Sequence, residues 1–255
     1  MAIGKARKEK IAGQSRFLAR LVTHFASVVN EKRRRIADAI TESENEQQPP
    51  TTLAVMNGAL APGERIAWLI ESVAMFYRAQ TGEVGMEQIR QNFRVGFYVL
   101  RNDLLVPEYE FSLRDRVRHC FRSHEENEFR YRLSNNTNPS VVVRCLQEQN
   151  LIIIEDCVNE EKKAQKQHKP TFYLRKGQEK YLKSMFAFPI MLYGLGADRY
   201  RAAIVVDTDV RKFFRERDRE NIKIFMEEVA LRLNMEAHVA GLLERLVQGE
   251  SNAHK

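Results

Sequence analysis

The stretch from Ser184 to Leu192, Ser-Met-Phe-Ala-Phe-Pro-Ile-Met-Leu, is nearly all apolar. Residues 194–198, Gly-Leu-Gly-Ala-Asp, separate it from a second run of the same kind, Tyr200 to Asp207, which reads Tyr-Arg-Ala-Ala-Ile-Val-Val-Asp. Two apolar runs joined by a short loop that contains glycine are typical of an antiparallel hairpin. The sequence therefore predicts two adjacent buried strands, and the rest of the fold is arranged around them.

The spacing of the apolar residues changes after this hairpin. They now recur every three or four positions, at Ile222, Met226, Val229, Leu233, Ala237, Ala240, Leu243 and Val247. This stripe, about seven turns long, predicts a helix over residues 218–247. Since so long a stripe can outreach the sheet beside it, we expect its start to lie in the core and its end to contact a second copy.

The basic residues are concentrated in two segments of the chain. The 255 residues carry a net charge of +7, with 44% hydrophobic and 29% charged residues, which suits a globular protein. Residues 1–40 hold ten lysines and arginines against three acidic residues, and residues 160–183 hold eight against three. This asymmetry shows where anions would be attracted and says nothing about the fold.

Membrane and disulfide signals are weak in this sequence. No apolar run approaches the roughly 18 residues that a membrane-spanning helix needs, so we expect no transmembrane segment. The three cysteines, Cys120, Cys145 and Cys157, are odd in number and widely spaced. They predict no disulfide framework and favour a reducing, cytoplasmic location.

The first 48 residues are predicted to form a basic amphipathic helix. Six apolar residues recur at helical spacing: Leu18, Val22, Phe25, Val29, Ile36 and Ile40. A charged run from Lys32 to Arg35 interrupts this stripe. Such a run is typical of a solvated helix face that packs on a partner elsewhere, and the alternative is a contact with nucleic acid or an anionic membrane.

Two prolines indicate the boundary of the main domain. Pro49 and Pro50 cannot continue a helix, whereas Pro62 is favoured in a first helical turn. The expected organisation is a helix over 1–48, a linker over 49–61, a main domain over 62–248 and a tail over 249–255.

The middle of the chain predicts a mixed set of elements. Residues 93–100 are aromatic and β-branched, and 104–113 return as a second strand with Pro107 at an edge or bulge. The apolar residues of 114–137 show no regular helical or strand spacing. Asn138 is expected to cap a helix that Asn150 ends in the left-handed conformation. A strand over 151–154 and a long basic loop over 157–183 follow. Hairpins with flanking helices predict an α+β fold with an antiparallel sheet.

Several of these segments resemble the GAF domain family, a module related to PAS domains that senses small molecules. The resemblance lies in Gln147–Asp156, Ser184–Ile190, Ala203–Asp207, the pair Phe213-Phe214 and the helix from Asp218. It implies an antiparallel sheet of five or six strands with long N- and C-terminal helices. It also implies dimerisation through those helices, here 14–41 and 218–247, as a coiled coil, and a ligand pocket beneath the connection that corresponds to residues 157–183.

The residues that could carry catalysis do not form a complete set. Asp207 and Asp209 follow a strand, as in some phosphatases, but the sequence lacks the other groups that this chemistry needs. His119, Cys120 and His124 lack the spacing of a zinc site. Buried structural thiols are the ordinary reading of Cys145 and Cys157. We therefore expect no enzyme activity, no cofactor and no metal.

The predicted function is that of a non-catalytic sensory or regulatory protein. Arginines bind anions bidentately and aromatic rings stack on bases, so the basic loop predicts a small anionic or nucleotide-like ligand. The candidate ligand-binding residues are Arg132, Asn135, Arg144, Asp156, Tyr173, Arg175, Ser184, Phe186 and Phe188. No output domain follows Val247, so a protein partner is expected to carry the output. The alternative is a scaffold or nucleic-acid-associated protein that binds through its basic N-terminal helix and keeps a vestigial pocket.

Overall fold

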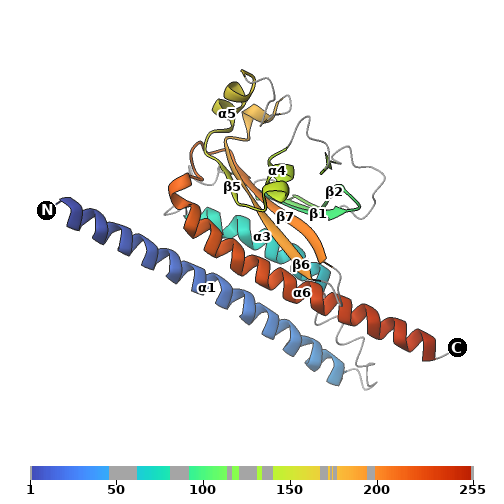
Figure 1. Ribbon diagram of the computed structural model, residues 1–255. Helices are drawn as coiled ribbons and strands as arrows, with labels where there is room; N and C mark the ends of the chain where they lie inside the picture. The colour runs from blue at the N-terminus through green and yellow to red at the C-terminus, as the bar shows by residue number, and fades with distance from the viewer. Residues whose placement is uncertain are drawn as a thin grey trace. The chain divides into compact units, whose positions relative to one another are not determined.

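The computed structural model describes residues 2–45, 62–80, 92–113, 117–120, 131–133, 140–166, 172, 174, 177–193 and 199–253 (Figure 1). The chain divides into two compact units, one of residues 66–237 and one of residues 1–65 with 238–255. The predicted linker lies outside the described residues, and the predicted domain boundaries stay predictions. No helix in the described part of the chain is long and apolar enough to cross a membrane.

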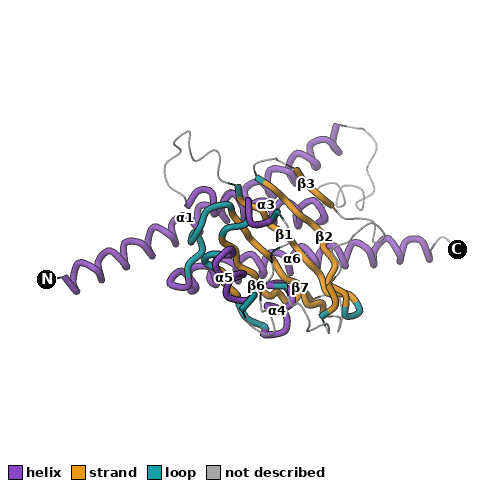
Figure 2. The backbone as a smooth tube through the Cα atoms, turned by 90° about the horizontal axis from the view of Figure 1, so that it is seen from above, coloured by secondary structure: helices purple, strands orange, loops and turns teal. Residues whose placement is uncertain are grey.

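The unit of residues 66–237 is built on one antiparallel sheet. Its described strands are β1 (Phe93–Arg101), β2 (Leu104–Ser112), β3 (Val117–Cys120), β4 (Tyr131–Arg132), β5 (Ile152–Ile154), β6 (Ser184–Tyr193) and β7 (Arg199–Thr208). They lie side by side in the order β3-β2-β1-β7-β6-β5, with β4 also paired to β2 (Figure 2). The expected α+β fold and the β6–β7 hairpin are confirmed.

The turn between β1 and β2 explains why this hairpin is tight. Asn102 and Asp103 both have positive φ, 48° and 64°, a conformation that Asn and Asp tolerate better than other side chains. Pro107 lies where the β1–β2 register shifts, between the parts of β2 that pair with β3 and with β4. The absence of an N–H on proline is accommodated at such a bulge, as the sequence predicted.

Two helices pack on one face of the sheet, which we call the helix face. They are α3 (Pro62–Gln80) and α6 (Arg219–Ala253) (Figure 1). Phe76 stacks on Phe225 with ring centroids 4.0 Å apart, and Tyr77 meets Phe186 edge-on at 5.5 Å. Each buried aromatic ring contributes roughly 1.5–3 kcal/mol through its removal from water. The predicted α6 stripe is buried from Ile222 to Leu233.

The opposite face of the sheet, which we call the lid face, carries α4 (Val141–Glu148) and a lid segment, residues 157–183. Within the lid segment lie α5 (Cys157–Ala164) and the 3-10 turn η2 (Gln178–Lys180). Figure 2 shows α4 and α5 on the near side of the strands. The loop predicted for 157–183 is therefore wrong over α5, which Asp156 starts by accepting a hydrogen bond from the Asn159 N–H at 3.1 Å.

Smaller corrections follow from local hydrogen bonds. The N-cap of α4 is Ser140, whose Oγ accepts from the Val143 N–H at 3.2 Å, and not Asn138. The left-handed residue at its end is Gln149, one position before the predicted Asn150. Residues 114–137, which showed no period, contribute β3 and β4, because strands of four and two residues are too short to establish an alternation.

The unit of residues 1–65 and 238–255 contains the predicted N-terminal helix, α1 (Ala2–Asn45). Its buried side chains are Leu21, Phe25 and Val28, spaced by four and three residues. Val22, which the sequence placed in the apolar stripe, is 68% exposed. Phe25 of the predicted stripe is buried, whereas the place assigned to Val22 is taken by its apolar neighbour Leu21, since adjacent residues of a helix face different directions.

Candidate functional site

The lid face holds a charged pair on the two central strands of the sheet. Arg94 of β1 and Asp207 of β7 are register partners, so their side chains leave the same face. Arg94 Nε donates to Asp207 Oδ1 at 2.7 Å, and Arg94 Nη2 donates to the same oxygen. The two side chains are 28% and 15% exposed. A largely buried ion pair is costly to desolvate, so this one is a candidate for a functional feature.

Burial controls the ionisation of this pair. It raises the pKa of the Asp207 carboxyl, and Arg94 limits that rise by favouring the carboxylate. Burial opposes the charge on Arg94, but Asp207 outweighs this effect and the pKa of the guanidinium is raised. We take Arg94 as charged throughout the physiological range, since a guanidinium does not lose its proton there. Arg94 therefore carries a fixed positive charge, which the Asp207 carboxylate balances.

An aromatic ring from the lid segment covers this charge. Arg94 Cζ lies 4.3 Å from the centroid of the Tyr181 ring, within the range of a cation–π interaction. Tyr181 follows η2 and is 40% exposed. The lid segment thus contacts the sheet at the buried Arg94 guanidinium.

A second polar contact lies beside this pair on the lid face. The Tyr98 hydroxyl donates to Glu110 Oε1 at 3.1 Å. The Tyr98 ring lies over Gly96, the register partner of Glu110, and a Cβ at position 96 would be 2.7 Å from Tyr98 Cε2. Glycine is required here because the ring occupies the space of a side chain. Arg94, Asp207, Tyr98 and Glu110 together form what we call the polar strip.

Apolar residues surround the polar strip. They come from the sheet, α4 and the lid segment, and include Val141, Leu146, Ile152, Phe172, Leu174, Met185 and Val205. Cys145 and Cys157 are buried among them as free thiols. Burial raises the pKa of both thiols, which disfavours the thiolate that a redox switch needs.

The residues predicted as ligand-binding do not gather in one place. Arg144 lies on α4 and Asp156 caps α5, both on the lid side of the sheet. Ser184, Phe186 and Phe188 belong to the alternate positions of β6, which point to the helix face. Arg132 lies on β4, and its side chain is outside the described part of the structure. Asn135, Tyr173 and Arg175 lie outside the described residues.

The sequence reasoning missed Arg94 and considered Asp207 only as part of an incomplete phosphatase-like pair at the end of a strand. A signal was available in β1, where Arg94, Gly96 and Tyr98 alternate with apolar residues and so mark one face as polar. Asp209, the second carboxylate of the phosphatase-like pair, accepts a hydrogen bond from the Asn92 N–H at 3.0 Å. Within the described residues, no group of three His, Cys, Asp or Glu could hold a metal ion.

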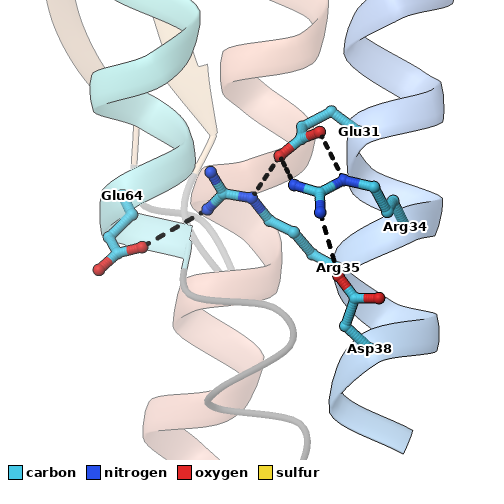
Figure 3. A network of polar contacts seen from close by, with 5 residues as sticks. All are labelled: Glu31, Arg34, Arg35, Asp38 and Glu64. Atoms are coloured by element: carbon cyan, nitrogen blue, oxygen red, sulfur yellow. Dashed lines mark hydrogen bonds and ion pairs between the residues drawn. The ribbon is translucent and has the colours of Figure 1, made fainter. Parts of the chain in front are cut away.

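The basic run on α1 is engaged with carboxylates. Glu31 accepts from Arg34 at 2.9 and 3.1 Å and from Arg35 at 3.0 Å (Figure 3). Arg34 also reaches Asp38 at 3.3 Å, and Arg35 lies 3.6 Å from Glu64. Hydrogen bonds from the two arginines lower the pKa of Glu31 to about 2. Two of the four cations in the run are thus partly neutralised, which weakens the case for a nucleic-acid contact.

Comparison with known proteins adds little to this geometry. No protein-family model matches the sequence, and no curated protein matches it. Among solved structures, the chain is similar to a free methionine-R-sulfoxide reductase from Neisseria meningitidis, solved in complex with its substrate. The two are 12% identical, with 73% of this chain and 86% of that chain covered and a TM-score of 0.41. That reductase has a GAF-like fold.

This comparison corrects one prediction. The expectation that the chain is not an enzyme is wrong by this finding, because the similar protein is an enzyme. A non-catalytic role is therefore not part of what we propose. At this identity and TM-score we take from the reductase neither an activity nor a catalytic residue.

Proposed function

We propose that the protein is a GAF-like regulatory module that binds a small anionic or nucleotide-like ligand on its lid face. The observation that carries the proposal is the Arg94–Asp207 pair with Tyr181 of the lid segment above it. A guanidinium recognises carboxylate or phosphate, and a tyrosine ring stacks on a planar group. An anion that replaces the Tyr181 ring over Arg94 would release the lid segment or reorder it.

The residues predicted from the sequence remain candidates within this proposal. Arg144, Asp156 and Arg132 would contribute from α4, the start of α5 and β4, and Asn135, Tyr173 and Arg175 from the segments next to them. Ser184, Phe186 and Phe188 would support the site from the helix face, by fixing β6. The lid segment would have two states, one held at Arg94 and one released. A ligand that favours one of these states shifts the equilibrium between them, and this shift is the signal.

The test uses the full chain and a thermal-shift assay. Inorganic phosphate, a dicarboxylate and a nucleoside monophosphate serve as probes, because a ligand that binds the native state raises the unfolding temperature. The expected result is a concentration-dependent rise with at least one probe, lost in Arg94→Lys, which keeps the charge but loses the fork and the stacking surface. Arg101→Lys, an exposed arginine on the same strand, is the matched control. No shift with any anion, or equal shifts in both variants, would overturn the proposal.

We also propose that the module works as a homodimer. The two copies would associate through α6 and through residues 14–41 of α1. Ile224, Leu231, Met235 and Leu242 are between 42% and 57% exposed and follow one another at intervals of seven, four and seven residues. These intervals place them on one stripe opposite the buried one, at the a and d positions of a heptad. We refer to them as the α6 seam.

A second copy of the chain is the occupant that this stripe fits best. Glu227 and Arg232 flank the seam five residues apart, the spacing of a salt bridge between parallel helices of a coiled coil, and in the single chain they pair with Lys223 and Glu228 of the same helix. Sedimentation should show a dimer for the native chain and a monomer for Leu231→Glu with Met235→Glu. Lys223→Ala, on α6 but outside the seam, should stay dimeric. A native monomer at tens of micromolar concentration would remove this part of the proposal.

A further inference from the structure

The lid segment is closed at its base. The Cys157 N–H donates to the Lys183 carbonyl at 2.9 Å, so the first and last residues of the segment are hydrogen-bonded to each other. The Lys183 N–H donates in turn to the Thr208 carbonyl at 2.9 Å, at the end of β7. We call residues 155–157 with 183–184 the neck. The two ends of the lid segment are therefore joined to each other and to the end of β7.

The neck is also bonded to the residues that lead into α6. Glu155 uses two oxygens for this: its carbonyl accepts from the Lys212 N–H at 2.8 Å, and its Oε1 accepts from the Glu216 N–H at 2.8 Å. We call residues 212–219 the α6 head. Glu155 directly precedes Asp156, the N-cap of α5, so one residue connects the start of the lid to the start of the long helix.

Ser184 makes a second connection on the other side of the neck. Its buried Oγ accepts from the Phe214 N–H at 3.1 Å and lies 3.2 Å from the Ile154 carbonyl, to which it can donate its single proton. Phe214 is 1% exposed and meets Tyr77 and Phe186 edge-on at 5.1 and 4.8 Å. A third contact, from Arg219 Nη1 to the Leu151 carbonyl at 2.8 Å, ties the first residue of α6 to the strand before the neck.

We propose that Glu155 and Ser184 form a relay that couples the lid segment to α6. A hydrogen bond between heavy atoms at about 2.8–3.2 Å is lost when they separate by roughly half an ångström more. A shift of the neck therefore either carries the α6 head with it or breaks these bonds. Since Phe214 and the first buried residues of α6 are closely packed against the helix face, the displacement passes into the helix. Glu155 and Ser184 act as positioning residues, and neither needs to touch a ligand.

This relay deepens the proposed function, since it states how occupancy of the lid face would reach α6. Its physical content is testable without any ligand. Tyr181→Ala removes the ring over Arg94 and so loosens the lid segment two residues before Lys183 of the neck, without changing Glu155 or Ser184. Hydrogen exchange of the full chain, read by mass spectrometry, then reports on the lid segment and the α6 head in the same experiment.

In the otherwise native chain, Tyr181→Ala should raise exchange several-fold in the lid segment and also in peptides of 212–222. When Tyr181→Ala is combined with Glu155→Ala, exchange in the lid segment should still rise. The rise in peptides of 212–222 should fall to less than half of that seen with Tyr181→Ala alone. Glu155→Gln keeps the side-chain oxygen that accepts from Glu216 and should restore transmission, a rescue that loss of stability alone would not give. Glu148→Ala, an exposed carboxylate on α4, is the matched control and should transmit as the native chain does.

Absence of a response in 212–222 when Tyr181 is removed would overturn the relay, as would an undiminished response in Glu155→Ala. If Glu155→Ala proves unstable, Ser184→Ala takes its place, because it removes the other bridge and leaves both Glu155 contacts intact. Failure of every anion in the thermal-shift assay would remove the ligand proposal and leave these exchange results unaffected. The two proposals can therefore fail separately.

Discussion

Two of the arginine–carboxylate groups in the described residues lie in very different surroundings. On the lid face, Arg94 and Asp207 are 28% and 15% exposed and lie under a tyrosine ring. On α1, Arg34 and Arg35 are 64% and 43% exposed around Glu31 (Figure 3). In both groups a guanidinium donates hydrogen bonds to a carboxylate. Only the first has given up water to do so, and the cost of this desolvation makes it the better candidate for function.

The largest difference is expected when one partner is removed from the buried pair. Arg94→Ala leaves the Asp207 carboxylate without its cation in a desolvated position, and we expect a loss of about 3–5 kcal/mol in the free energy of unfolding. Urea denaturation measures it. Arg34→Ala is the matched change on α1 and should leave the free energy of unfolding close to that of the native chain, because exposed ion pairs contribute little to stability. Equal effects of the two variants would show that burial does not distinguish the regions.

A second test changes the lid face without touching a charge. In Gly96→Ala the new Cβ would lie 2.7 Å from the Tyr98 ring, so the ring must move and its hydrogen bond to Glu110 is lost. We expect a loss of about 1–3 kcal/mol, the usual cost of overpacking. Tyr98→Phe, which loses only the hydroxyl, should cost about 0.5–1.5 kcal/mol. A Gly96→Ala variant as stable as the native chain would contradict the placement of the ring.

Tyr181 tests the contact between the lid segment and the buried cation. Tyr181→Leu keeps an apolar side chain and removes the ring over Arg94, for which we expect a loss of about 0.5–2 kcal/mol. The measurement is again urea denaturation. Tyr193→Leu, an exposed tyrosine on β6, is the control and should have little effect. If the two substitutions are indistinguishable, the lid segment is not held at Arg94.

These tests also separate what the sequence could and could not predict. The hairpin of 184–208, the strands at 93–112 and the buried start of α6 were predictable, because each repeats its apolar period over enough residues. The positions of the caps differed by one or two residues, since Asn138, Ser140, Gln149 and Asn150 offer neighbouring polar choices.

The polar strip could not be predicted in the same way. It depends on the register between β1 and β7, which pairs Arg94 with a residue 113 positions away. A shift of one residue would move both side chains to the opposite face. For the same reason Phe186 and Phe188 were assigned to the ligand although their parity on β6 points them to α3 and α6. A sequence shows which residues alternate, and only the pairing shows which face they share.

The smallest effect is expected for Glu31, and pH reveals it better than mutation. Its pKa is lowered from 4.5 to about 2 by hydrogen bonds from Arg34 and Arg35. A depressed carboxylate pKa contributes stability that is fully present above the unfolded value near 4.5 and is lost as pH falls toward 2. A carbon-13 NMR titration of the Glu31 side chain should therefore show a midpoint well below the ordinary glutamate value of 4.5. An ordinary midpoint would mean that the α1 network does not persist in solution, which would return Arg34 and Arg35 to the cations available for nucleic acid.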